Sequence, residues 1–371
     1  MSSRLASTFA RFMQVSFIPG PSQLYFTLED HMRQAMRTQV GSLSHRSKEF
    51  ESIFAEVSSG LKQLLSIPSD FHIFFTGSAT EIWERSVQNL VDMNSFHFVN
   101  GAFSRRYYEI ALQLSKQAVK AEVPAGKGFA DEVSIPSGME MIAVTHNETS
   151  TGVSLPLDFI HSLREKNKEA IIVVDAVSSL PYPKLDFTKI DSVFFSVQKG
   201  FGLPAGLGVW IVNDRCMAKA DQLLTRGISI GTYHSLPTLL ANQKKNQTPE
   251  TPNVLAIYLL SKVVQDMLRV GIDKIRQDTE YKAAILYHAL ESHPDLSPFV
   301  QEKQFQSKTV IVADCKEYVG PVTQRLLQHN LFPGDGYGEF KKTQLRFANF
   351  PTHSREQFEL LVDVLGEVGD R

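Results

Sequence analysis

Short apolar runs of strand length alternate with helix-like segments through the first two thirds of this 371-residue chain. Residues 71–75 form such a run, residues 76–80 resemble a turn, and residues 81–90 have the spacing of a helix. Further runs occupy residues 141–145, 170–174, 192–196 and 208–212, and another helical stretch covers residues 156–167. Strands that are apolar throughout are buried on both faces, so the pattern predicts an α/β fold with a mostly parallel sheet between helices.

The pattern changes near residue 253. A turn-rich segment covers residues 246–253, and a long helical pattern follows from residue 254 to about residue 291. The later elements are predicted as a strand at 308–313, a helix at 322–329, a glycine-rich loop at 333–338, a strand at 344–348 and a helix at 355–368. The predicted parts are an N-terminal arm (1–16), a large domain (17–253) and a smaller C-terminal α+β domain (254–371).

The charge balance and the cysteine count exclude several classes of protein. The chain has 38 Lys and Arg against 40 Asp and Glu, so its net charge of −2 gives no broad field for binding nucleic acid or an anionic membrane. No apolar run reaches the roughly 18 residues of a membrane-spanning helix. Cys216 and Cys315 are too few for a disulfide framework or a Cys-rich metal site, which favours a reducing, cytoplasmic location. Residues 1–17 contain Arg4 and Arg11 and no acid, as in transit peptides and also in short N-terminal arms.

Two candidate catalytic residues follow predicted strands. Asp175 ends the run 170–174, and Lys199 follows the strand at 192–196 and precedes a glycine-rich turn. In open α/β sheets the carboxyl ends of strands face the ligand crevice. A desolvated lysine can form an imine with an aldehyde cofactor and carry protons, while a carboxylate against a pyridine nitrogen keeps that ring cationic. Taken alone, a lysine is usually a surface residue and an aspartate often only ends a strand. Together they predict a pyridoxal 5'-phosphate (PLP) enzyme, with both residues catalytic.

Further residues could complete a cofactor site. The candidates are Ser78, Ala79, Thr80, Phe103, Asn147 and Thr149. Residues 78–80 join a strand to a helix, where free backbone N–H groups and the helix dipole can bind the PLP phosphate, although an ordinary helix cap has the same composition. The aromatic ring can stack on the cofactor, although most single aromatics belong to the core. The Asn and Thr side chains can bind the hydroxyl of the cofactor ring.

Amino-acid substrates carry carboxylates, which a guanidinium binds through two hydrogen bonds. Arg46 lies in a Ser-His-Arg-Ser-Lys-Glu-Phe segment, and Arg346 lies inside an apolar strand, where a buried cation needs a partner. We expect both arginines to be buried and to bind substrate. His45 is a third candidate for substrate binding, although a solitary histidine is more often structural than catalytic.

These segments together resemble the class-V aminotransferases, and within them the phosphoserine aminotransferases. The similar segments are Pro19-Gly20-Pro21, the segment 44–50, Asn147-Glu148-Thr149, Asp175 with Ser178-Ser179, Gln198-Lys199, 204–207 and Thr248-Pro249, with Arg346 as a weaker match. The resemblance implies PLP-dependent fold type I with a seven-stranded sheet. It also implies transfer of an amino group from glutamate to 3-phosphohydroxypyruvate, in serine biosynthesis.

The resemblance further implies roles for residues that the pattern of strands does not single out. Gln198 is expected at the cofactor, and Phe103 takes the ring-stacking position that is usually Trp in this family. The implied assembly is a homodimer with active sites at the interface, where Gln247 and Thr248 reach the PLP phosphate of the neighbouring subunit. No nucleic-acid or membrane partner and no metal are expected.

Some residues depart from the family pattern and leave alternatives open. Where a His-Arg pair is expected before Arg346, residues 338–342 read Gly-Glu-Phe-Lys-Lys, and the loop at 77–81 lacks a basic residue. Lys341, Lys342 and His45 could compensate. One alternative is a relative that uses alanine or serine with glyoxylate or pyruvate. A cysteine desulfurase or lyase of the same fold, which needs a reactive Cys on a mobile loop, and a catalytically silent PLP-fold binding protein remain further alternatives.

Overall fold

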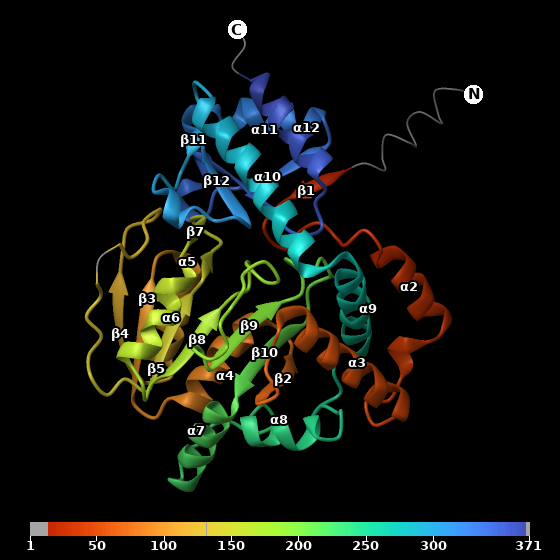
Figure 1. The fold of residues 1–371 in the computed structure, drawn as a ribbon, viewed down its shortest axis with the longest axis vertical. Coiled ribbons are helices and arrows are strands. Elements are labelled where there is room, and N and C mark those ends of the chain that lie inside the picture. The colour runs from red at the N-terminus through yellow and green to blue at the C-terminus, as the bar shows by residue number, and fades with distance from the viewer. Residues whose placement is uncertain (1–13, 131, 369–371) are drawn as a thin grey trace.

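A seven-stranded sheet forms the centre of the larger part of the molecule (Figure 1). The computed structural model describes residues 14–130 and 132–368, so residues 1–13, with Arg4 and Arg11, lie outside the described part. In pairing order the strands are β2 (Phe71–Thr76), β10 (Gly208–Asn213), β9 (Ser192–Ser196), β8 (Ile171–Asp175), β5 (Met141–Thr145), β3 (Asn94–Val99) and β4 (Gln117–Glu122). The strands from β4 to β9 pair in parallel, and only β10 runs antiparallel to its neighbours β2 and β9. The predicted mostly parallel sheet of seven strands is confirmed.

Helices cover both faces of this sheet. One face carries α2 (Leu28–Arg37), α3 (Lys48–Leu65), α6 (Leu157–Lys166) and α9 (Val254–Val270), and the other carries α4 (Ala79–Leu90), α5 (Ala102–Gln113), α7 (Asp214–Thr225) and α8 (Leu236–Gln243). Successive strand residues point to opposite faces. In β8, Ile172 and Val174 join the first apolar cluster, whereas Ile171 and Val173 join the second. This burial on both sides is the reason the strands are apolar throughout.

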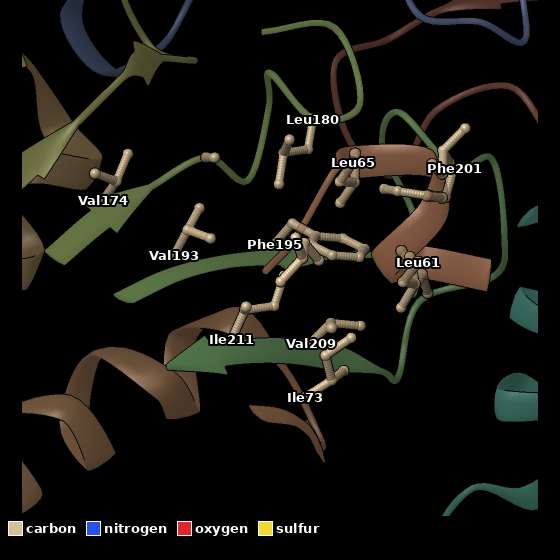
Figure 2. Close-up of a cluster of buried hydrophobic side chains, with 14 of the residues drawn as sticks. Leu61, Leu65, Ile73, Val174, Leu180, Val193, Phe195, Phe201, Val209 and Ile211 are labelled. Carbon is tan, nitrogen blue, oxygen red and sulfur yellow. The ribbon is translucent and has the colours of Figure 1, made fainter. Parts of the chain in front are cut away.

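The first apolar cluster joins α3 to the middle of the sheet. Figure 2 shows Leu61 and Leu65 of α3 close to Phe195 and Val209 of the central strands. Phe195 also stacks on Phe201 of the following turn, with ring centroids 4.5 Å apart. This packing fixes the end of β9 and the turn after it, which together carry Lys199.

The smaller part of the molecule has its own sheet and core. Its strands, in pairing order, are β1 (Val15–Phe17), β13 (Leu331–Asp335), β14 (Gln344–Ala348), β12 (Val310–Asp314) and β11 (Ser297–Pro298). Its helices are α10 (Ile272–Ser292), α11 (Val319–Gln328) and α12 (Arg355–Gly366), and short 3-10 turns lie at Lys303–Phe305, Lys316–Tyr318 and Gly338–Lys342. A further 3-10 turn, Val40–Ser42, belongs to the larger part, between α2 and α3. A third apolar cluster, in which Phe17 packs edge-to-face on both Phe347 and Phe358, joins the helices of the smaller part to its sheet. The predicted α+β architecture of the C-terminal part is confirmed.

The packing argues for domain limits that differ from those drawn from the sequence. The long helical region is two helices, because Gly271 between α9 and α10 adopts a φ of 89°. Residues Val254 to Met267 of α9 belong to the core of the large sheet, whereas α10 contributes from Ala283 to the core of the small one. We therefore propose that the small domain begins near Gly271. We also propose that it includes Val15–Phe17, because β1 pairs with β13.

Two further features concern single segments. The glycine-rich loop predicted at 333–338 is wrong in its first part, because Pro333 and Gly334 lie within β13. That strand pairs with β1 over residues 331–333 and with β14 over residues 334–335, and this pairing overrides the turn preference of Pro and Gly. None of the helices in the described part of the chain combines the length and apolar composition that crossing a bilayer needs.

Candidate active site

A cavity of about 240 Å³ opens at the carboxyl edge of the large sheet. Thr145 of β5 lies opposite Asp175 of β8, and Gly208 of β10 lies opposite both Thr76 of β2 and Ser196 of β9. The carboxyl ends of β2, β5, β8 and β9 therefore meet at one edge, as the doubly wound topology requires. The cavity is closed by the start of α4, by the segment Pro19–Pro21 and, from the small domain, by Arg346 on β14.

Lys199 lies in this cavity, just beyond the end of β9. Its side chain is buried, and Nζ donates to Thr149 Oγ1 at 3.0 Å and lies 5.3 Å from the centre of the Phe103 ring. Burial lowers the pKa of Lys199 to about 8, although the carboxylate charges of Asp175 and Glu148 act in the opposite direction. Gly20, at a φ of 154°, passes so close that a Cβ atom would lie 2.9 Å from Lys199 Cε. The lysine is therefore enclosed and partly neutral near physiological pH.

Asp175 ends β8 and lines the same cavity. Its carboxylate is buried, and it accepts hydrogen bonds from the backbone N–H of Val177 at 3.0 Å and from the indole N–H of Trp83 at 2.8 Å. Burial raises the pKa of Asp175 to about 6, while these two hydrogen bonds and the charge of Lys199 oppose the rise. At pH 7 the group is therefore mostly a carboxylate, available to a cationic partner.

The three residues Ser78, Ala79 and Thr80 line the cavity where α4 begins. The Ser78 hydroxyl caps the helix by accepting from the Glu81 N–H at 3.1 Å, and the Ala79 N–H donates to Ser196 Oγ at 3.3 Å. The dipole of a twelve-residue helix places partial positive charge at this end. Residues 78–80 can therefore act both as an ordinary helix cap and as an anion site, because the capped start of the helix lines the cavity.

Phe103 enters the cavity from the start of α5, and the buried Glu148 holds that helix start in place. One carboxylate accepts from the N–H groups of Phe103 and Ser104 at 3.3 and 2.9 Å, and from the Ser104 and Ser150 hydroxyls at 2.8 and 2.7 Å. A Cβ atom on Gly101 would lie 2.3 Å from Glu148 Cγ, so only glycine permits this approach. Glu148 therefore fixes the aromatic ring beside Lys199.

Two side-chain amide oxygens from residues of the cavity wall have no hydrogen-bond partner within the described part of the protein. Asn147 donates to Ser178 Oγ at 2.8 Å, but its Oδ1 atom is buried with no hydrogen bond, and the same holds for Gln198 Oε1. Both residues line the cavity. Buried polar atoms are normally paired, so a ligand with a hydrogen-bond donor fits here.

Arg346 reaches the cavity from the small domain and is only partly buried. Nε donates to the Asp335 carbonyl at 2.7 Å, Nη1 donates to the Thr149 carbonyl at 3.1 Å, and the guanidinium lies 5.4 Å from the centre of the Tyr337 ring. Burial lowers its pKa. Among the described residues, no carboxylate lies within 4.0 Å of Arg346. The Arg346 guanidinium is thus positioned by two backbone carbonyls and an aromatic ring, and it can bind an anionic ligand in the cavity.

The remaining predicted residues lie elsewhere on the chain. His45, Arg46, Gln247 and Thr248 do not line the cavity with Lys199. Arg46 is exposed, so its expected burial is wrong: the guanidinium donates to Gln247 Oε1 at 2.7 Å, to Asn242 Oδ1 at 3.3 Å and to the Pro249 carbonyl at 3.2 Å. The structure therefore divides the predicted site into a cavity group and a second group outside the cavity, which we call the 45–248 cluster; Arg46 of this cluster is exposed, whereas Thr248 is buried.

The loop that carries Gln247 and Thr248 is connected to the start of α4 through His234. Thr248 donates to the Glu250 carbonyl at 2.7 Å, and the Glu250 carboxylate lies 3.4 Å from Nε2 of the buried His234. Nδ1 of the same imidazole hydrogen-bonds to Glu81, whose other oxygen accepts from the Gly77 N–H at 2.9 Å. Burial lowers the pKa of His234, but its bonds to Glu250 and Glu81 outweigh this effect and raise the pKa to about 9. A protonated histidine thus joins two carboxylates.

Sequence reasoning missed Trp83 and Tyr337, which line the cavity, and Glu148, which supports it from the start of α5. Trp83 follows Ala79 by one helical turn, so helical periodicity places both on one face of α4, and this spacing was a usable signal. Glu148 lies inside the motif Asn147–Thr149 but was given no role. Tyr337 follows β13 in a segment interpreted only as loop, where no residue pattern points to the cavity.

The residues present fit PLP. An anion site at the start of α4, an enclosed amine, a carboxylate and unpaired amide oxygens surround one cavity. The alternative of a desulfurase lacks its nucleophile, because Cys216 and Cys315 are both fully buried and do not line the cavity. Burial raises the pKa of Cys315 to about 12, which keeps it an unreactive thiol. Among the described residues, no group of three or more His, Cys, Asp or Glu is arranged to hold a metal ion.

The sequence and the fold were also compared with known proteins. The model of the family "Aminotransferase class-V" matches residues 127–329, which is more than half of the chain. The crystal structure of a phosphoserine aminotransferase from Cytophaga hutchinsonii is 51% identical, covers 95% of this chain and 98% of its own, and superposes with a TM-score of 0.94. A phosphoserine aminotransferase from Rhodococcus opacus is 28% identical over 330 residues, which cover 87% of each chain.

A more distant structure shows the fold alone. Alanine–glyoxylate aminotransferase from Nostoc is 22% identical, covers 96% of this chain and 95% of its own, and has a TM-score of 0.80. The family match, the 51% identical structure and the PLP-type cavity agree with one another. This chain therefore belongs to the class-V aminotransferases, a family of PLP-dependent transaminases.

Proposed function

We propose that this chain is a phosphoserine aminotransferase that moves the amino group of glutamate to 3-phosphohydroxypyruvate, yielding 2-oxoglutarate and phosphoserine. The observation that carries the proposal is the convergence of Lys199 and Asp175 in a cavity that also contains the N-terminus of α4 and Arg346. The proposed substrate follows the 51% identical relative from Cytophaga hutchinsonii and the relative from Rhodococcus opacus, which share this name. The reaction would serve serine biosynthesis.

Each cavity residue would have its own role in the reaction. PLP, when bound, supplies an aldehyde carbon that accepts the amino group and a cationic ring that withdraws electrons from the substrate Cα. Lys199 would hold it covalently and then, as a free amine, move the proton from the substrate Cα. Asp175 would keep the ring nitrogen protonated, and residues 78–80 would bind the phosphate. The Phe103 ring beside Lys199 would stack on the cofactor and exclude water.

Arg346 is the proposed anchor for the substrate carboxylate. A guanidinium offers a planar pair of donors that matches a carboxylate, and Arg346 has no carboxylate partner of its own among the described residues. Gln198, Asn147 and Thr149 would bind the polar atoms of the cofactor and the substrate nearby. Both ends of a small amino acid would then be fixed with its Cα near Lys199.

The 45–248 cluster leads us to propose a homodimer. All four residues of this cluster lie outside the cavity of their own chain, and Arg46 hydrogen-bonds to Gln247. In a twofold dimer the cluster of one protomer would complete the cavity of its partner, adding the Arg46 guanidinium for the substrate phosphate and polar groups for the PLP phosphate. The two buried free cysteines favour a reducing, cytoplasmic setting.

A mixing experiment tests this arrangement. Lys199→Ala and Arg46→Ala homodimers are both expected to be nearly inactive. After unfolding and refolding together, a shared interface site predicts recovery of about a quarter of the wild-type activity, because half of the dimers are mixed and each of these has one intact site. A mixture that stays as inactive as its components would contradict a site shared between protomers.

A second candidate is transamination of alanine or serine with glyoxylate or pyruvate. The observation in its favour is that residues 338–342 lack the expected His-Arg pair, and Lys341 lies 3.6 Å from Asp335 rather than in the cavity. The distant Nostoc structure shows that the same fold serves such an enzyme. The fold alone therefore does not select between these substrates.

A panel of half-reactions separates the two candidates. The holoenzyme is mixed with one amino acid at a time, and the loss of the visible absorbance of lysine-bound PLP is followed. The proposal expects glutamate and phosphoserine to discharge the chromophore quickly and alanine and serine to do so slowly. Discharge by alanine or serine but not by phosphoserine would move the assignment to the second candidate. A wild-type protein that binds no PLP would support a silent protein instead.

A further inference from the structure

The carboxylate of Asp175 is held by one donor on each oxygen. Oδ1 accepts from the backbone N–H of Val177 at 3.0 Å, and Oδ2 accepts from the indole N–H of Trp83 at 2.8 Å. Both side chains are buried, with 3% of Asp175 and 5% of Trp83 exposed. Little of either residue is exposed to water, and the indole contact is the only one of the two that a side-chain substitution can remove.

The indole of Trp83 is itself fixed by its neighbours. It stacks on Tyr107 with ring centroids 5.9 Å apart and lies against Phe103 at 6.5 Å. The Tyr107 hydroxyl is bonded to Ser86 Oγ at 2.5 Å, so α4 and α5 hold the aromatic pair from both sides. An indole has a single N–H and no acceptor, so Trp83 can only donate.

The position of Trp83 on α4 connects the two ends of the cavity. The helix begins at Ala79, where the phosphate would bind, and Trp83 lies one turn further on. With a rise of about 1.5 Å per residue, the two positions are about 6 Å apart along the helix axis. A single rigid element thus supports both the anion site and the acid that faces the ring nitrogen.

We propose that Trp83 is a positioning residue of this active site: its indole N–H fixes the Asp175 carboxylate in the orientation that meets the ring nitrogen of PLP. The proposal rests on the proposed PLP chemistry. It predicts that loss of the N–H weakens cofactor binding and turnover together, because the buried carboxylate loses both its orientation and a donor that stabilises its charge.

The chain offers a matched control for the test. Trp210 on β10 is also buried and donates its indole N–H to a side-chain oxygen, Ser192 Oγ at 2.9 Å, but it does not line the cavity. Trp83→Phe and Trp210→Phe therefore remove the same group from two buried sites. Both variants are expected to melt at lower temperature than the wild type.

Only Trp83→Phe is expected to bind PLP about ten-fold or more weakly to the apoenzyme and to lower kcat by a similar factor, with KM within about two-fold. Equal PLP affinity and equal kcat in the two variants would overturn the proposal. In an Asp175→Asn background, Trp83→Phe should add little further loss if it acts through the carboxylate. An undiminished loss in that background would also overturn it.

A spectroscopic measurement does not depend on the folding of Trp83→Phe. The chain has two tryptophans, so protein labelled with ¹⁵N-tryptophan should give two indole signals, and Trp210→Phe assigns them. Asp175→Asn is expected to shift the Trp83 signal and leave the Trp210 signal in place. If neither signal moves, the inference fails while the PLP chemistry stands. If the wild type does not bind PLP, the proposed function fails, and this inference with it.

Discussion

The enclosure of Lys199 sets the pH at which the enzyme can capture its cofactor. Burial lowers the pKa of Lys199 from 10.5 to about 8. The attacking species is the neutral amine. At pH 7 about one molecule in ten is then neutral, whereas at a pKa of 10.5 about one in three thousand would be. The rate at which the apoenzyme captures PLP should therefore rise with pH and level off above a midpoint near 8.

The neighbouring charges should move this midpoint in opposite directions. Asp175 raises the pKa of Lys199 and Arg346 lowers it, both less strongly than burial. Asp175→Asn should therefore move the midpoint to lower pH, and Arg346→Gln should move it to higher pH. Stopped-flow absorbance after mixing apoenzyme with PLP, from pH 6 to pH 10.5, measures the midpoint independently of the amplitude. A midpoint near 10, or shifts of the same sign in both variants, would refute this reasoning.

Three further predictions concern the support of the cavity. Glu148→Gln should lower the free energy of unfolding by about 2–3 kcal/mol in urea titrations. Glu148 accepts five hydrogen bonds, and the amide nitrogen of Gln, itself a donor, cannot accept those that it would face. An unchanged midpoint would contradict this role. The pKa of His234 is raised to about 9, so its stabilisation is complete below pH 6.5 and is lost as the pH rises through 9. His234→Gln should therefore cost about 1–2 kcal/mol at pH 6, after allowance for solvent screening, and almost nothing at pH 10, and a loss independent of pH would speak against a protonated histidine. Arg346→Lys should raise KM for the amino acid about ten-fold or more with a smaller effect on kcat, and steady-state kinetics in which only kcat falls would argue against carboxylate binding.

The sequence was sufficient to predict those parts of the site whose positions follow from the order of strands and helices and from the topology of the sheet. Asp175 and Lys199 come directly after apolar strands, and the parallel topology brings the ends of such strands to one edge. The start of α4 at residues 78–80 was visible for the same reason, since it joins a strand to a helix. These predictions needed only the alternation of elements.

Features that depend on tertiary contacts could not be predicted from the sequence. The spacing of Trp83 from Ala79 places it on the cavity face of α4, but its hydrogen bond to Asp175 depends on the packing of α4 against the sheet, which the local pattern does not show. Arg46 was expected to be buried, but three acceptors on another segment hold it at the surface. The division at Gly271 was missed because helical periodicity continues on both sides of one glycine.

The most direct test of the account is to locate the lysine that holds PLP. The holoenzyme is reduced with borohydride and digested, and the phosphopyridoxyl peptide is identified by mass spectrometry. Lys282 is an internal control, because it is also buried and burial lowers its pKa to about 7, but it donates to the Phe350 and His353 carbonyls in the small domain. The account predicts the label on Lys199 and its loss in Lys199→Ala. Labelling of Lys282, or of no lysine, would contradict it.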